Sequence, residues 1–594
     1  MSSSPSSEAH QVYHESTSVP REAIDLLSPP QYDHTLHIPD EVLLKFLLPL
    51  VFEPFATWDI CVSVKHPAFV ASQVSSNWRR IALGAPILWS NIQVGCPRLY
   101  DHFRVSEDSL RKWNVGTKIR KELVTLWLSR SAQCPLDVHF NDRGGGLPMG
   151  VNPVAKDVIQ FFGKYYVDLY NLILPCSSRL KVLQFDLELY PFNLPILRLL
   201  HIPPQKLPSL QRIDVKLKVP HGMDTAAIDF DIPGQRRLLK GGAFRTPSLH
   251  SLSISGSGWG DLRSLDVLSS WPGIEAIDFS NGAAPTSLDQ LILLLKSLPE
   301  LRRCRYRLIN PQDHPLTPPS DAIHHSRLES LSLHDDPPPL GFATLLNFPS
   351  LKSLEMAYVA LKTDPDSQVH DDRGSRVVEM ILQFGSQLTS LNLVLRHDIF
   401  DQPSFHPKIF LGHLPELLHF TLIPLWKSKP DSGPNLGFLF EIPAMPSLTL
   451  ELPTGPSIVH EPGVTPEGRD SSTLEALVLE HGASAESEQD NSESNAGRWC
   501  PKLRSLYTLL RNRTGAAEHA LVDFIVSRRR NKLSQNPFNS EVALPQITEV
   551  EVEYSSEPKV NILEELREKG VDMRGLTLKL KYPEYFQMYE DEVF

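Results

Sequence analysis

The segment Leu351-Lys352-Ser353-Leu354-Glu355-Met356 contains the pattern from which the architecture of this chain can be predicted. A leucine is followed, after two intervening residues, by a second leucine and then, after one polar residue, by another apolar side chain. This apolar–polar–apolar ending predicts a short β-strand with one buried face. The same phrase begins at Leu328, just before this segment, and again at Leu388, after it. One such unit cannot bury its apolar face alone, so the pattern predicts that neighbouring units stack.

The phrase recurs along most of the chain from about residue 178. It starts at Leu180, Leu210, Leu249, Ile274, Leu301, Leu328, Leu351, Leu388, Leu417, Leu474 and Leu503, with Leu301 the weakest copy. Most starts lie between 23 residues apart, as for Leu328 and Leu351, and 39 apart, as for Leu210 and Leu249. Leucine-rich repeats have periods of about 20 to 29 residues, so the copies resemble an irregular form of that repeat.

The segments between the strands predict helices that pack behind them. Leu288 to Leu298 is the clearest, because its leucines recur at helical spacing. The expected fold class is therefore α/β, an irregular leucine-rich-repeat solenoid with parallel strands on one side and helices on the other. The alternative is a set of unrelated buried strands. In the solenoid, one side of a curved parallel sheet should bury Leu331, Leu333, Leu351, Leu354, Leu391 and Leu393.

A different pattern precedes the repeats. Pro39 suits the first position of a helix, since its missing N–H would have no partner there. Asp40 and Glu41 add negative charge to the first turn, where the helix dipole favours it. One apolar stripe then follows, formed by Val42, Leu43, Phe46 and Leu47.

A second helical segment follows, and it ends before Pro86-Ile87-Leu88-Trp89. Its apolar face is formed by Val70, Val74, Trp78, Ile81 and Ala82. Helices this short are not stable alone in water, so they need each other or a partner to cover their stripes. The alternative is an ordinary small helical bundle that buries its own core.

In this order, the features resemble an F-box, the helical module that docks a substrate receptor onto the Skp adaptor of a cullin ubiquitin ligase. Ile38 replaces the more common leucine before the proline. The link from Pro49 to His66 is longer than in a minimal F-box, as in the F-box-like proteins of fungi. Those proteins often continue with a segment similar to residues 127–136, which begins Trp127-Leu128-Ser129-Arg130-Ser131. The resemblance covers residues 38–140.

The resemblance implies a substrate-recognition subunit that binds the Skp adaptor, and through it a cullin, while the repeats hold an unknown protein target. The residues expected to contact the adaptor are Ile38, Pro39, Val42, Leu43, Phe46, Val74 and Trp78. A second hypothesis is a repeat-based interaction scaffold that recruits no ligase. The two hypotheses differ in the first helix. Its apolar stripe should be exposed to solvent in the isolated chain if it binds an adaptor, and buried if it has become part of the fold.

Composition narrows the class of protein. The chain has 594 residues, 41% of them hydrophobic and 22% charged, which is ordinary for a globular protein. A formal net charge of −12 disfavours a nucleic-acid partner, and we find neither a signal peptide nor an apolar run that could span a membrane.

The six cysteines lack zinc-ligand spacing, which fits a cytoplasmic or nuclear protein with buried thiols. Known catalytic, phosphate-binding and metal motifs are absent, so we expect no enzyme activity, cofactor or metal.

The expected organisation has four parts. They are a disordered tail (1–33), the F-box-like domain (34–95), a connecting segment that begins the solenoid (96–177) and the solenoid itself (178–594), with a disordered loop at about 482–497. Within the connecting segment, Thr117 to Ser131 predicts a helix with Ile119, Leu123, Leu126 and Trp127 on one side. Leu136 to Phe140 predicts a strand. Leu123 and Trp127 should pack between the F-box-like helices and the first repeats, joining them rigidly.

The C-terminal region is expected to cap the solenoid. Its elements are a helix at Glu518–Arg530, a strand at Val550–Tyr554 and a last helix at Ile562–Lys569. The basic run Ser527 to Lys532 has two interpretations. The favoured one is a set of cations at a helix C-terminus, where they complement the helix dipole, and the alternative is a nuclear import signal. We expect the pairs Asp335-Asp336, Asp371-Asp372 and His324-His325 to lie at the surface.

Overall fold

The architecture was analysed in a computed structural model of the chain. The structure describes residues 39–52, 66–95, 107–142, 156–190, 192–218, 242–256, 271, 273–280, 287–308, 322–358, 373–396, 399, 404–405, 407–425, 500, 502–510, 515–529, 546–554 and 558–582. The expected tail at 1–33, the loop at 482–497, the pair Asp371-Asp372 and the repeat copy at Leu474 lie outside these residues.

Most of the described strands form one long parallel sheet. The described residues form a 14-stranded sheet whose strand order follows the chain order, and all of its pairings are parallel. Its strands are β1 (Asn91–Gly95), β2 (Leu136–Asn141), β3 (Leu180–Glu188), β4 (Arg212–Lys218), β5 (Ser251–Gly256), β6 (Ala276–Phe279), β7 (Arg303–Leu308), β9 (Ser330–Asp335), β11 (Ser353–Tyr358), β12 (Ser390–Arg396), β13 (His419–Leu425), β14 (Ser505–Leu510), β15 (Glu549–Tyr554) and β16 (Thr577–Lys581). Two short strands, β8 (Ile323–His324) and β10 (Leu346–Asn347), pair separately.

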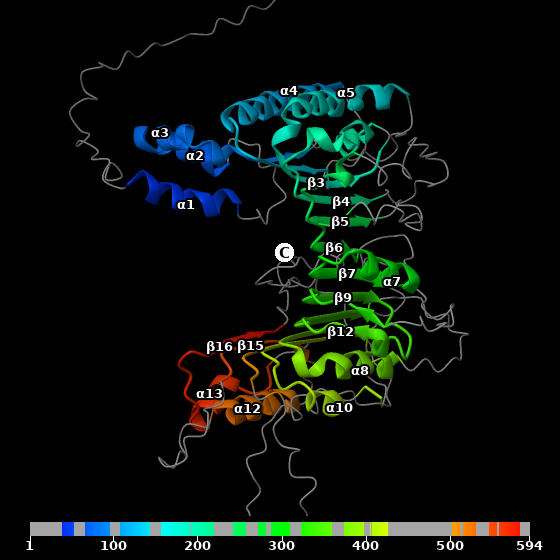
Figure 1. Ribbon diagram of the computed structural model, residues 1–594. Coiled ribbons are helices and arrows are strands. Elements are labelled where there is room, and N and C mark those ends of the chain that lie inside the picture. Colours follow the sequence, from blue (N-terminus) through cyan, green and yellow to red (C-terminus); the bar gives the residue numbers. More distant parts are fainter. Residues whose placement is uncertain are drawn as a thin grey trace, which may run out of the picture.

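Helices connect successive strands and lie beside the stack, as Figure 1 shows for α7 and α8. The α-helices after the N-terminal module are α4 (Glu107–Arg130), α5 (Lys156–Ile173), α7 (Leu288–Ser297), α8 (Arg373–Phe384), α10 (Pro407–Leu411), α12 (Ala516–Arg529) and α13 (Ile562–Glu568). Short 3-10 helices are η4 (Leu174–Arg179), η5 (Leu194–His201), η6 (Pro204–Lys206), η7 (Gly242–Arg245), η10 (Ala343–Leu345) and η11 (Gly385–Gln387). The chain is thus an α/β protein with a long parallel sheet, consistent with a repeat solenoid.

The repeated leucines build the core between the sheet and the helices. The six leucines expected on one side of the sheet are all buried, so that prediction is confirmed: Leu331, Leu333, Leu351, Leu354, Leu391 and Leu393. Their strands are in register, because Leu354 is the partner of both Leu331 and Leu391. Each copy therefore places its apolar positions over those of the next, which gives one continuous core.

The N-terminal helices are α1 (Asp40–Phe52), α2 (Pro67–Val74) and α3 (Ser76–Gly84), followed by the 3-10 helix η3 (Pro86–Trp89). The second helical segment is not the single helix that its apolar spacing predicted. Ser75 is extended, with φ −152°, and its hydroxyl accepts a hydrogen bond from the Trp78 amide to cap α3. Because the chain turns there, Ile81 and Ala82 are buried while Val70 and Val74 are exposed.

Helix α4 joins this module to the sheet. The Trp127 ring lies 4.8 Å from the Trp89 ring and 5.5 Å from that of His66, between centroids, and stacks on Phe69 at 6.4 Å. Leu123 is half-buried against the same core. The expected packing of Trp127 and Leu123 is confirmed. However, α4 begins ten residues before Thr117, and Ile119 is exposed rather than on the buried side.

Several elements differ from the sequence prediction. Strand β1 lies within the range expected to be only F-box-like, and α5 and β16 were not predicted. The expected C-terminal helix, strand and last helix correspond to α12, β15 and α13, but β16 follows them as the final strand of the sheet. Among the described helices, none is long and apolar enough to cross a membrane.

Candidate partner-binding surfaces

The residues expected to contact an adaptor divide into exposed and buried groups. Phe46 is 67% exposed and Val42 54% exposed on α1, and Val74 is likewise exposed on α2. Pro39 is also exposed, Trp78 is half-buried, and Ile38 lies outside the described residues. Leu43, by contrast, is only 4% exposed.

The helical spacing explains this division. Leu43 and Leu47, four residues apart, pack into the module, whereas Val42 and Phe46, also four apart, point to solvent. The apolar stripe predicted from the sequence therefore has two sides. Leu43 and Leu47 on one side are buried, and Val42 and Phe46 on the other are exposed. Large exposed apolar side chains on neighbouring helices are typical of a docking surface.

An ion pair fixes α1 against α3. The two Arg80 Nη atoms donate to the Asp40 carboxylate at 2.6 and 2.8 Å, and one of them also donates to the Asn77 side-chain oxygen at 2.8 Å. The Arg80 hydrogen bond lowers the pKa of Asp40 below its usual value. Both side chains of this pair are exposed, so it links α1 to α3 but adds little stability.

The sheet carries a second candidate surface, on the face opposite the leucine core. One polar side chain from each strand stands in register across the sheet, and we call this set the polar row. Its members are Gln93, His139, Gln184, Asp214, Ser253, Asp278, Arg305, Ser332, Glu355, Asn392, Thr421, Tyr507, Glu551 and Lys579.

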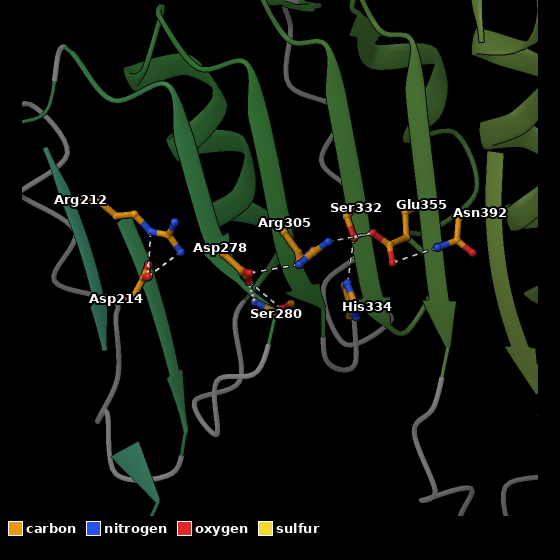
Figure 2. A network of polar contacts seen from close by, with 9 residues as sticks. All are labelled: Arg212, Asp214, Asp278, Ser280, Arg305, Ser332, His334, Glu355 and Asn392. Carbon is orange, nitrogen blue, oxygen red and sulfur yellow. Dashed lines mark hydrogen bonds and ion pairs between the residues drawn. The ribbon is translucent and has the colours of Figure 1, made fainter. Parts of the chain in front are cut away.

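The centre of the polar row is a network of charges and hydrogen bonds (Figure 2). Arg305 lies between two carboxylates, with one Nη atom 3.3 Å from Asp278 and the other 3.4 Å from Glu355. Burial lowers the pKa of Arg305, but the two carboxylates outweigh this and raise it. Glu355 also accepts hydrogen bonds from Ser332 at 2.8 Å and from Asn392 at 3.2 Å.

His334 extends this network through Ser332. Its Nε2 lies 2.8 Å from the Ser332 hydroxyl. Burial lowers the pKa of His334, so its ring is neutral at pH 7. Since Ser332 has one proton and donates it to Glu355, His334 must donate from Nε2 to the serine oxygen.

This geometry differs from that of a nucleophilic triad. In such a triad the imidazole accepts the serine proton and a carboxylate holds the other ring nitrogen. Here Glu355 accepts directly from Ser332, and Ser332 is only 3% exposed. The hydroxyl therefore acts as a hydrogen-bond donor within the sheet face, and the arrangement supplies no general base for it.

A similar pair lies two strands away from Asp278, where Arg212 Nε donates to Asp214 at 2.8 Å. Burial raises the pKa of Asp214, against the effect of Arg212, and the nearby Asp278 raises it further. The polar row thus holds several carboxylates at close range with arginine partners. Such a face can present directional polar contacts to a protein ligand.

Three surface expectations were wrong. Asp335 and Asp336 are buried, because Arg307 bonds to Asp335 and Arg373 lies 3.7 Å from Asp336. His325 is also buried, with Nε2 2.8 Å from the Leu298 carbonyl oxygen, although His324 is exposed. In each case a polar group distant in sequence lies beside the buried side chain.

The described part of the basic run, Ser527 to Arg529 at the end of α12, is not exposed to solvent. Arg528 and Arg529 are buried, and they donate to the carbonyl oxygens of Cys500 at 2.8 Å and Arg574 at 2.6 Å. This contradicts a nuclear import role for these two residues. Cys304 and Cys500 are buried thiols, as expected, and burial raises the pKa of each to about 12, whereas Cys134 and Cys176 are only half-buried. Among the described residues, no group of three or more His, Cys, Asp or Glu could hold a metal ion.

The polar row was not identified from the sequence, although a signal for it exists. In the recognised copies from Gln184 onward, each member follows the second apolar residue of the phrase, as Glu355 follows Leu354 and Tyr507 follows Leu506. Which of these residues pair depends on strand register, which the sequence does not give directly.

The comparisons with known proteins are weak. No family model matches the chain, and the search of curated proteins found no match. A crystal structure of a Bacteroides fragilis protein is similar to 36% of this chain and 70% of its own, with 12% identity and a TM-score of 0.23. The function must therefore be argued from the residues of this chain.

Proposed function

We propose that the chain is a non-enzymatic substrate-recognition subunit of a Skp–cullin–F-box-type ubiquitin ligase. The observation that carries the proposal is the exposure of Val42 and Phe46 within a segment that resembles an F-box. An isolated chain that used α1 only for its own core would bury these side chains.

The energetics of docking support an adaptor site on α1 and α2. Fully burying a valine or phenylalanine side chain stabilises a complex by about 1.5–3 kcal/mol. Phe46, Val42 and Val74 are all largely accessible and can contribute such terms, with Pro39 at the start of α1. Leu43 and Trp78 act indirectly, by holding the helices in place.

The remainder of the chain would hold the target. The polar row offers a long surface of partly exposed side chains, and α4 connects it firmly to the N-terminal module through Trp127. In this proposal the subunit contributes proximity, because it raises the effective concentration of target lysines near a ubiquitin-charged enzyme. A cullin is then recruited through the adaptor, in the cytoplasm or the nucleus.

A pull-down with purified Skp adaptor tests the proposal. The double variant Val42→Ser/Phe46→Ser should weaken adaptor binding more than about tenfold, because each side chain loses more than 1.4 kcal/mol of burial. The matched control is Val115→Ser/Ile119→Ser, which changes two apolar residues on α4 that are 53% and 50% exposed. The control should bind like the unmodified chain. Equal binding by all three proteins would refute the adaptor site.

A second candidate is an interaction scaffold that recruits no ligase. It is favoured by the way the module shares its core with the sheet, since Leu47, Leu88 and Trp89 belong to the same buried cluster as the repeats. In that case α1 would be an integral cap of the fold. A properly folded chain that fails to bind any Skp adaptor would favour this candidate.

A further inference from the structure

The last strand of the sheet has an open edge in the described part of the chain. β16 pairs with β15, and the Thr577 amide donates to the Thr548 carbonyl at 2.8 Å. In a parallel pair, alternate residues bond to the same neighbour, so Thr577, Lys579 and Lys581 face β15. The N–H and C=O groups of Leu578 and Leu580 consequently point away from β15, towards the open edge.

The two ends of the sheet differ in how well their core side chains are covered. In β1, Ile92 and Val94 are buried, and the side chains of Arg120 and Tyr165 both donate to the Gly95 carbonyl, at 2.9 and 3.0 Å. In β16 the equivalent inward residues, Leu578 and Leu580, are only half-buried. Their partners in β15, Val550 and Val552, are fully buried. One more strand beside β16 would bury its leucines as β16 buries those valines.

Charge also alternates between the last two strands. On the sheet face Glu551 of β15 forms an ion pair with Lys581 at 2.8 Å and accepts a hydrogen bond from Lys579 at 3.3 Å, and Glu549 lies 3.6 Å from Lys579. Lys579 remains largely exposed beyond these contacts. A further strand with a carboxylate in the same register would place it beside Lys579 from the other side.

We propose that the open edge of β16 binds an extended segment of a partner protein, which adds to the sheet as a further strand. Such a segment would place an acidic residue opposite Lys579, whose side chain is exposed, and apolar residues that cover Leu578 and Leu580. Backbone hydrogen bonds supply affinity in this mode of binding, and the alternating side chains supply specificity. The inference is independent of adaptor binding at α1 and α2.

Lysines on an edge strand can instead serve to prevent pairing. Two features favour a docking edge here. Exposed Lys579 disfavours pairing with a strand that carries a cation in the same register, but it attracts a strand that carries a carboxylate there. The inward positions of β16 are apolar and half-exposed, whereas a blocked edge gains from polar ones.

The test uses a labelled peptide with the sequence of residues 548–554, because that segment already matches one side of β16. Fluorescence anisotropy with the full chain should show saturable binding. Bound peptide should slow hydrogen exchange at the Leu578 and Leu580 amides by at least about tenfold, since both become hydrogen-bonded. A peptide with all three glutamates replaced by lysine should bind at least about tenfold more weakly. Methylation of alternate peptide nitrogens should abolish binding.

Two variants of the chain provide matched controls. Leu580→Pro and Leu580→Ala both remove the leucine side chain, but only proline removes the outward N–H, which does not bond to β15. The alanine variant should bind the peptide and the proline variant should not, while exchange in β15 stays unchanged in both. The proposal is wrong if no binding occurs, or if the methylated peptide binds equally well. Protection of the Leu578 and Leu580 amides in the chain alone would also overturn it, because the edge would then be covered already.

Discussion

His66 offers a sharp test of how the N-terminal module is held against the sheet. The side chain is buried, and its Nδ1 accepts a hydrogen bond from the Ala68 amide at 3.2 Å, which caps α2. Its ring centroid lies 6.4 Å from that of Trp89 and 5.5 Å from that of Trp127. Burial lowers the pKa of His66 from 6.5 to about 4.

This shift makes stability depend on pH in a defined direction. Above pH 6.5 the ring is neutral in the folded and the unfolded chain, so titration contributes nothing. As the pH falls below 6.5 the unfolded chain gains a proton that the folded chain does not, and stability is lost until about pH 4. One pKa unit corresponds to about 1.4 kcal/mol, so the full loss is about 3 kcal/mol and the loss at pH 5 about 2 kcal/mol.

Urea denaturation followed by tryptophan fluorescence can measure this term. His66→Asn is the matched variant, because asparagine keeps a capping acceptor for α2 and does not titrate. The unmodified chain should lose about 2 kcal/mol more than the variant between pH 7 and pH 5. The loss of ring packing in the variant adds a constant offset that cancels in this comparison. A stability difference that stays constant from pH 7 to pH 5 would refute the reasoning.

Three further predictions concern the core, a buried carboxyl and α4. Leu354→Ala should lower the free energy of unfolding by about 2–5 kcal/mol, whereas a change below 1 kcal/mol in urea denaturation would contradict tight packing at this site. Burial raises the pKa of Asp142 to about 6, so ionisation of this carboxyl should reduce stability as the pH rises from about 4 to 6, opposing the effect of His66 over the same range. In thermal unfolding, the stability of the unmodified chain relative to Asp142→Asn should therefore fall from pH 4 to 6, and a difference that does not change with pH would contradict the shift. Amide hydrogen exchange should be slow at residues 117–130, and fast exchange there would mean that the module is not rigidly attached.

Local periodicity predicted the strands of the repeat well. In β11 and β12 the phrase's leucines and Met356 are buried while Glu355 and Asn392 between them are only partly buried, because alternation decides which side chains face the core. The same signal was available for two elements that were not predicted. Leu578 and Leu580 alternate with lysines in β16, and α5 buries Phe162, Tyr166 and Leu169 at helical spacing.

Other features could not be obtained from local sequence. Arg305 and Glu355 lie 50 residues apart in the chain, and strand register alone brings them together. Asp335 was expected at the surface because an aspartate pair between a strand and prolines is usually solvated, yet Arg307 allows its burial. The first helix shows the same limit, since its apolar stripe did not reveal that Leu43 packs inward while Phe46 stays exposed.

The central claim, that α1 and α2 form an adaptor-binding surface, can be tested by hydrogen exchange of the full chain with and without a purified Skp adaptor. The account predicts slower exchange throughout α1 and α2 at saturating adaptor, with α7 and α8 unchanged. Unchanged exchange in α1 and α2 under the same conditions would contradict it.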